Sequence, residues 1–313
     1  MQPNFLKIFT TAKQKRQRQI YFGGLAIMFS LALILFLPTQ WFFKIGAVFV
    51  TVFLFFTFLN QLRLGVYVLA SVSFFYGWEI VLSRYNWSKN IAYLTSINAP
   101  LMDYIAVVLF ISLLASFVLK KYKINWSHLR YLILPTALYA LFLLFALVSV
   151  YLAYDNNTAS SAKFWLRNML FVYFAYILLV NIFINSEVVL HKILRIWYYV
   201  GLIVAGFGLS SLIVVSQTGW NRVVPYGIGS FAPLGHNHNL IAEVLVAIIP
   251  IAFYFLIKNL NKDKRNWYLA GLLIMIFALL LTLSRAGWLS LTIQALIALW
   301  FFRKQVKHFF AKK

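Results

Sequence analysis

The chain has 313 residues, 63% of them hydrophobic, and its 28 Lys and Arg against 6 Asp and Glu give a formal net charge of +22. This apolar share excludes an ordinary soluble domain, and the lack of cysteine excludes disulfides and thiolate metal sites. The basic residues lie in short segments between apolar runs, which is typical of membrane orientation signals and argues against a nucleic-acid partner.

The apolar runs are each close to twenty residues long, which is enough for a helix to cross a hydrocarbon core of about 30 Å. We predict spans at about 20–37, 41–59, 64–83, 104–119, 131–154, 169–185, 196–215, 240–257, 267–283 and 287–302. The predicted fold class is therefore all-α, a polytopic integral membrane protein with about ten transmembrane helices. A second run follows the first almost at once, which indicates a span and not a cleaved signal peptide.

The basic residues predict how these spans are oriented. Of the 28 Lys and Arg, 21 fall in segments that alternate spans place on one side, six fall on the other side, and Lys44 lies within a span. Because positively charged loops stay in the cytoplasm, both the N- and the C-terminus are predicted to be cytoplasmic. We divide the chain into a basic N-terminus (1–19), a scaffold of about seven spans (20–215), a motif region of one outer loop and three spans (216–302), and a basic tail (303–313).

Two of the carboxylates, Glu79 and Glu243, fall inside predicted spans. An ionisable side chain at that depth is costly and usually faces the bundle interior or a wet cavity. Glu79 lies near the outer end of its span, where Arg84 or Lys89 is its expected partner. Glu243 follows Asn239 by four residues, so the two are predicted to share one helix face.

The outer loop 216–239 combines bend-forming residues with polar ones. Glycine and proline permit sharp bends and close approach to a ligand, and the loop contains Pro225, Gly227, Gly229, Pro233 and Gly235. His236 and His238 alternate as a metal-binding pair would, but no third ligand has a suitable spacing, so no metal site is predicted. By residue type, Asn239 fits the N-cap of the next helix.

Arg222 in this loop and Arg285 between the last two spans are both predicted to lie on the outer side. The guanidinium group is always charged and binds phosphate oxygens through a bidentate fork. Two interpretations stay open from position alone. The arginines bind an anionic ligand, or Arg285 pairs with Glu243 and anchors a helix end.

These residues form an ordered set of short motifs: Arg222, Gly229-Ser230-Phe231, Gly235-His236-Asn237-His238-Asn239 and Ser284-Arg285-Ala286-Gly287-Trp288. Over about 222–302 the chain resembles the O-antigen ligase and polymerase superfamily of bacterial envelope proteins. The resemblance implies a metal-independent glycosyltransferase without a cofactor, in the synthesis of lipopolysaccharide or another cell-envelope polysaccharide. Such an enzyme moves a glycan from an undecaprenyl-diphosphate carrier to an acceptor hydroxyl on the outer face of the bacterial inner membrane.

The resemblance also implies roles for individual residues. Arg222 and Arg285 would contact the diphosphate, where negative charge accumulates as the sugar–phosphate bond breaks, and a suitably placed His238 would act as the base. The substrate pocket would be shaped by Gly229, Gly235, His236, Asn239 and Ser284 of these motifs and by Glu243, four residues after Asn239.

One departure from the superfamily pattern concerns the C-terminal side. Members usually continue into a large outer loop with a catalytic histidine and then further spans, whereas this sequence stops at Lys313, and His308 lies in the basic inner tail. A truncated gene product, a partner chain that supplies the missing C-terminal segment, and a different function are the three explanations. The alternative functions are a transporter or non-catalytic binding protein for a lipid-linked glycan, and a non-catalytic membrane scaffold. Membrane lipids are expected partners in each case.

Overall fold

The computed structural model describes residues 41–75, 79–81, 98–122, 126–152, 161–162, 164–214, 222–227, 232–235, 237, 239–259 and 264–311. The N-terminal segment 1–19 and the predicted span 20–37 lie outside these residues. Within the described part the chain forms nine α-helices, with two short strands, β1 (Glu79–Val81) and β2 (Asn98–Pro100), that pair with each other. It folds as two compact units, one of residues 1–66, 81–97 and 103–185 and the other of residues 67–80, 98–102 and 186–313.

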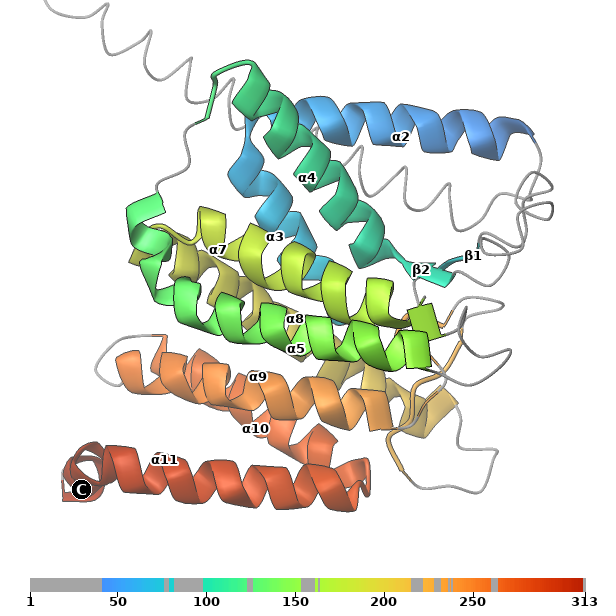
Figure 1. Cartoon of the computed structure of the whole chain (residues 1–313). Helices are drawn as coiled ribbons and strands as arrows, with labels where there is room; N and C mark the ends of the chain where they lie inside the picture. The colour runs from blue at the N-terminus through green and yellow to red at the C-terminus, as the bar shows by residue number, and fades with distance from the viewer. Residues whose placement is uncertain are drawn as a thin grey trace, which may run out of the picture. The chain divides into compact units, whose positions relative to one another are not determined.

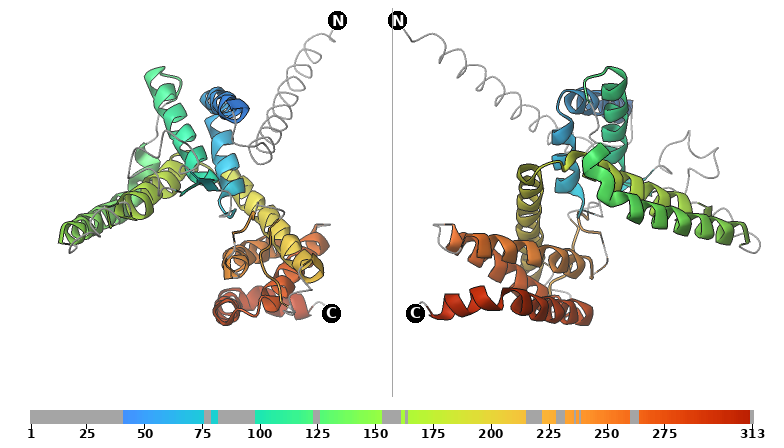
Figure 2. Two further views of the ribbon diagram at one scale, coloured as in Figure 1. Left: turned by 90° about the vertical axis from the view of Figure 1, so that its right-hand side faces the viewer. Right: turned by 60° about the vertical axis from the view of Figure 1, so that its left-hand side comes forward.

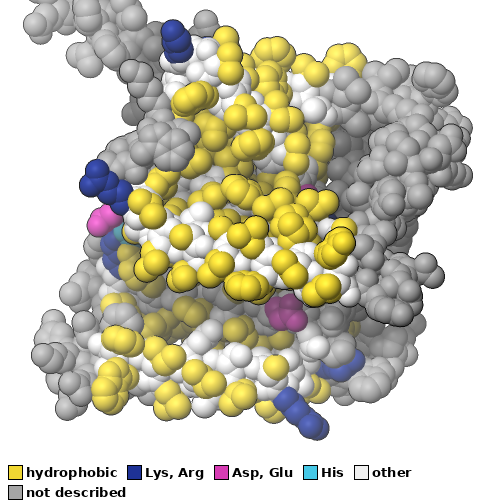
Figure 3. All heavy atoms as spheres, viewed as in Figure 1, with side chains coloured by type: hydrophobic (Ala, Val, Ile, Leu, Met, Phe, Trp, Pro, Cys, Tyr) yellow, Lys and Arg dark blue, Asp and Glu magenta, His cyan; other side chains and the backbone are white. Residues whose placement is uncertain are grey.

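Five described helices are long and apolar enough to cross a membrane: Leu101–Val118, Leu129–Leu152, Trp165–Phe183, Glu187–Val214 and Asn239–Lys258. Three shorter apolar helices accompany them: Phe49–Asn60, Leu62–Val72 and Arg265–Leu281. In the space-filling view most coloured side chains are hydrophobic, and charged ones are few (Figure 3). By the length and composition of its helices, the chain is a mainly helical, multi-pass membrane protein.

In the first unit, α4 (Leu101–Val118) contacts α2 (Trp41–Asn60) and the first turns of α3 (Leu62–Val72). A Cβ atom on Gly65 of α3 would lie 2.6 Å from Leu109 Cδ1 of α4, so glycine permits this contact. The Ser112 hydroxyl of α4 donates to the Phe55 carbonyl of α2 over 3.3 Å. Small residues and hydroxyl groups hold helices together in membranes, where the hydrophobic effect provides little attraction between them.

Among the described residues, the rest of the first unit forms two antiparallel helical stretches. One is η3 (Trp126–Leu132) with α5 (Ile133–Leu152), and the other is η5 (Trp165–Phe171), η6 (Tyr173–Leu178) and α7 (Leu179–Phe183). Both η5 and η6 are π-helical, a rare conformation in proteins. Aromatic and polar contacts join the stretches, since the rings of Tyr139 and Tyr173 stack 4.2 Å apart and the Thr136 and Tyr173 hydroxyls lie 2.7 Å apart.

The second unit is built around α9 (Asn239–Lys258), which contacts α8 (Glu187–Val214), α10 (Arg265–Leu281) and α11 (Arg285–Ala311). Figures 1 and 2 show α9, α10 and α11 side by side. Their core contains Tyr198, Ile248 and Met275, each fully buried. A Cβ atom on Gly201 of α8 would lie 2.6 Å from Ile248 Cγ2 and 3.1 Å from Met275 Cε, so α8 approaches both neighbours closely.

Two helix boundaries correct the sequence-based prediction. The segment 186–195 was predicted to be a short connection, but α8 begins at Glu187, after Ser186. Serine is a favoured N-cap residue by type, and the Lys and Arg side chains that follow are good helix formers, so the polar segment extends the helix instead of breaking it. Helix α11 likewise continues from the predicted span to Ala311, through most of the basic tail.

The third predicted span, 64–83, is wrong in its second half. Helix α3 ends at Val72, and Glu79, which was predicted inside the span, lies in strand β1. The Ser71 and Ser73 hydroxyls donate to the Tyr67 and Ala70 carbonyls near the end of α3. Serine side chains that bond the local backbone in this way compete with the helical pattern, which gives a physical reason for the early end.

Candidate functional site

The loop that carries Arg222 is fastened to the C-terminal part of α8. Val223 is fully buried, and a Cβ atom on Gly208 of α8 would lie 2.8 Å from its Cγ1 atom. The backbone N–H of Val224 donates to Ser211 Oγ over 3.0 Å. Tyr226 stacks on Phe207 at 4.2 Å, with the rings 4° from parallel. These contacts hold the described stretch 222–227 in a defined position although it contains no regular secondary structure.

The same loop is also tied to the end of α10. The Val223 N–H donates to the Leu281 carbonyl over 2.8 Å. Leu281 is the last residue of α10, and Arg285 begins α11 after a turn of three residues. One backbone hydrogen bond therefore brings the Arg222 segment to the turn before Arg285, although the two arginines are far apart in the sequence.

The turn between α10 and α11 is shaped by its own polar groups. Leu283 has a positive φ of 55°, which is uncommon for a residue other than glycine. The Thr282 hydroxyl donates to the Leu279 carbonyl over 2.7 Å. Ser284 caps α11, since its Oγ accepts the backbone N–H of Gly287 over 3.3 Å. Ser284, predicted to shape the substrate pocket, thus has a capping role in the structure.

The first turns of α9 and α11 lie against each other. A Cβ atom on Gly287 of α11 would lie 3.3 Å from the Ala242 Cβ atom of α9. Gly235 has φ +76°, a conformation that glycine adopts readily, and its N–H donates to the Ala232 carbonyl over 2.9 Å in the turn before α9. The N-termini of α9 and α11 therefore lie at the same end of the second unit as the Arg222 loop.

The N-cap prediction for Asn239 is wrong. Asn239 is the first residue of α9, and its N–H donates to the Asn237 side-chain oxygen over 3.0 Å. The tight turn at Gly235 places the earlier asparagine where a capping side chain is needed, since such a side chain accepts from an N–H two or three residues ahead. Asn239 and Glu243 lie one turn apart on α9, as predicted, with Glu243 exposed.

The pairing of Arg285 with Glu243 is not formed. Both side chains are described and exposed, and the ion pair found among the described residues joins Arg167 to Asp103 instead. Arg285 also stands at the N-terminus of a 27-residue helix, where the helix dipole adds partial positive charge. The Arg222 segment, Arg285 and the N-termini of α9 and α11 share this end of the second unit with the exposed carboxylate of Glu243, and arginines and helix N-termini are groups that favour anions.

Three predicted site residues, Gly229, His236 and His238, lie outside the described residues. No group of three or more His, Asp or Glu side chains suited to a metal ion occurs within the part of the chain that the structure describes. The assignments of His238 as base and of Gly229 and His236 as pocket residues stay predictions.

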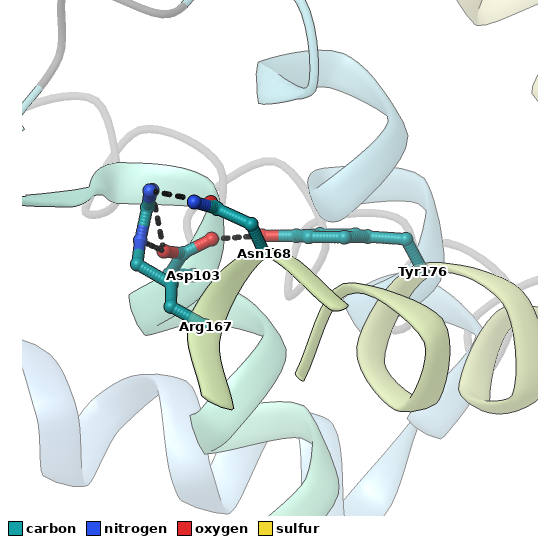
Figure 4. A network of polar contacts seen from close by, with 4 residues as sticks. All are labelled: Asp103, Arg167, Asn168 and Tyr176. Carbon is teal, nitrogen blue, oxygen red and sulfur yellow. Dashed lines mark hydrogen bonds and ion pairs between the residues drawn. The ribbon is translucent and has the colours of Figure 1, made fainter. Parts of the chain in front are cut away.

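A polar network in the first unit was not foreseen from the sequence (Figure 4). Arg167 donates from Nε and Nη2 to Asp103 Oδ2 over 3.1 and 3.0 Å, and the Tyr176 hydroxyl donates to the other carboxylate oxygen. Asp103 is only 8% exposed. The predicted spans leave Asp103 and Arg167 in two separate connecting segments, and their opposite charges beside two span ends were the one available signal. Arg167 is thus engaged in holding α4 to η5.

The chain matches none of the protein-family models, curated proteins or solved structures with which it was compared. The functional assignment therefore depends on the residues and geometry described above.

Proposed function

We propose that the end of the second unit formed by Arg222, Arg285 and the first turns of α9 and α11 binds the diphosphate of an undecaprenyl-linked glycan. The protein would be a glycosyltransferase of the O-antigen ligase or polymerase type in the bacterial inner membrane. In the proposed topology of ten spans with both termini in the cytoplasm, this end faces outward. The observation that carries the proposal is the hydrogen bond from Val223 to Leu281, because it joins the two arginine-bearing segments.

The proposed reaction needs stabilisation of a leaving group more than activation by a metal. The acceptor hydroxyl attacks the anomeric carbon, the bond from that carbon to the phosphate oxygen breaks, and undecaprenyl diphosphate departs with the bonding electrons. The acceptor proton passes to a base, for which His238 is proposed. Fixed cations lower the barrier because negative charge grows on the diphosphate in the transition state, and loss of one such group typically costs about 10²–10³-fold in kcat.

The test uses the full chain reconstituted in lipid nanodiscs with an undecaprenyl-diphosphate-linked oligosaccharide and an acceptor glycan. Arg222→Ala and Arg285→Ala are compared with Arg265→Ala. The last is a matched control because Arg265 is also exposed and also begins a helix, α10, at the opposite end of that helix from Leu281. Binding and product formation are measured separately.

We expect both site variants to weaken donor binding and to lower transfer by at least about a hundredfold, with Arg265→Ala near wild type. Donor binding that needs both arginines, but without any product, would favour the alternative of a non-catalytic binding protein or a transporter. In that case donor flux across liposomes would distinguish the two. Donor binding that is unchanged in both variants would refute the proposed site.

A further inference from the structure

A second polar cluster lies at the other end of the second unit, formed by His191 of α8 with Tyr254 and Lys258 of α9. The rings of His191 and Tyr254 stack at 5.7 Å with an angle of 16° between them. Lys258 Nζ lies 2.5 Å from His191 Nε2 and 3.4 Å from the Tyr254 hydroxyl. We call these three residues the His–Tyr–Lys cluster. Nothing in the proposed transfer reaction uses them.

The hydrogen-bond chemistry of the cluster leaves an excess of donors. A lysine ammonium cannot accept a hydrogen bond, so Lys258 must donate to His191 Nε2. The neutral imidazole then carries its proton on Nδ1. The Tyr254 hydroxyl lies 3.4 Å from that nitrogen. Beyond its bonds to His191 and Tyr254 the ammonium keeps one of its three N–H groups, and the hydroxyl keeps its own proton to donate. The chemical complement of such a group is an acceptor-only anion.

The charges around the cluster favour an anion as well. Arg195 follows His191 by one turn on the same face of α8, and Lys192 lies 5.9 Å from the centre of the Tyr67 ring. Glu187, one turn before His191, is exposed and forms no ion pair with these described cations. The cluster is therefore set among three exposed cations, Lys192, Arg195 and Lys258, and one exposed carboxylate, Glu187, so the net charge of these side chains is positive.

The depth of the cluster in the membrane points to the source of the anion. Helix α8 has 28 residues, so it is about 42 Å long and exceeds a hydrocarbon core of about 30 Å. The part of α8 that extends beyond the hydrocarbon core is its polar N-terminal part, which contains His191. Helix α9 has 20 residues and ends at Lys258, so in the proposed membrane-spanning arrangement its last turn lies at the membrane surface on the same end. Phosphate groups of lipids lie at this level.

We propose that the His–Tyr–Lys cluster is a binding site for a phosphate group with net negative charge, supplied by an anionic lipid headgroup. Lys258 and the His191 ring would contact the phosphate oxygens, and the Tyr254 hydroxyl would add a third hydrogen bond. Arg195 would contribute to the attraction from one turn away. The site does not depend on the proposed transfer reaction, because it lies at the opposite ends of α8 and α9 from the Arg222 loop.

The test is native mass spectrometry of the full-length protein in detergent, titrated with dihexanoyl phosphatidic acid or dihexanoyl phosphatidylcholine. We expect the first lipid to bind and Lys258→Gln to weaken its binding by about tenfold, as expected for loss of a charged hydrogen bond. His191→Phe keeps the ring stack but removes both nitrogens and should weaken binding as well. Lys258→Arg keeps the charge and should bind nearly as wild type. Lys264→Gln is the control, because it removes an exposed cation next to α10 outside the cluster.

Addition of inorganic phosphate then distinguishes the two sources of the ligand. Displacement of the lipid at millimolar phosphate would support a site for any phosphate, and retention of the lipid would support a headgroup site. Equal binding of the zwitterionic lipid would overturn the proposal, and so would an equal loss of binding in Lys258→Gln and Lys264→Gln. Thermal unfolding of each variant, monitored through tryptophan fluorescence, tests whether the compared proteins are folded.

Discussion

Helix α9 contains a proline, and another helix compensates for the hydrogen bond that it removes. Pro250 has no N–H, so the Val246 carbonyl one turn earlier lacks its usual partner within the helix. Gln294 of α11 donates its Nε2 to this carbonyl over 2.9 Å. Replacement of Gln294 by Met keeps the length of the side chain but removes the donor. We expect loss of this bond to cost about 1 kcal/mol, the size measured for polar contacts between membrane helices and for lost buried hydrogen bonds. Part of this cost is offset because methionine also removes Gln294 Oε1, which is buried without a partner.

The same substitution in a Pro250→Ala variant makes this prediction specific. In Pro250→Ala the new N–H at position 250 can bond the Val246 carbonyl, and Pro250 is exposed, so little packing is lost. The free-energy change caused by Gln294→Met should then be more favourable by about 1 kcal/mol than in the presence of Pro250, and this difference is the coupling free energy of a double-mutant cycle. The four proteins are compared by reversible unfolding in mixed micelles. An equal loss of stability from Gln294→Met in both backgrounds would refute the reasoning.

Two further predictions concern packing and charge. A Cβ atom on Gly271 would lie 2.0 Å from the Tyr198 hydroxyl, whereas one on Gly206 would meet nothing within 4 Å. Gly271→Ala should therefore destabilise the protein by about 1–3 kcal/mol. Gly206→Ala should be neutral, or should stabilise it by up to about 1 kcal/mol. Similar midpoints of thermal unfolding for the two variants would contradict this expectation. Asp103→Asn should destabilise by about 1–3 kcal/mol because it weakens a charged, largely buried contact. In the Arg167→Gln background the same change should cost clearly less, and strictly additive losses would show that the pair is not coupled.

The helical content of the described part could be predicted from the sequence because long apolar runs in a membrane have few alternatives to a helix. The C-terminal end of α3 and the N-terminal end of α8 could not be predicted from the sequence. They depend on local competition between serine hydroxyls and the helix backbone and on the helix-forming tendency of a polar segment, and hydropathy detects neither. The pairing of Asp103 with Arg167 was missed for another reason, since it joins two helices that are separated by 64 positions in the chain.

For the candidate site, the sequence alone determined the residue types, and the charge distribution and the count of predicted spans predict that Arg222 and Arg285 lie on the same side of the membrane. Only the tertiary structure decided that the Arg222 loop is bonded to the end of α10, that Asn237 caps α9, and that Arg285 is not paired with Glu243. These outcomes depend on distances of a few ångströms between separate elements. The physical reason is that hydrogen bonds and ion pairs form only at such distances, and helix packing sets them.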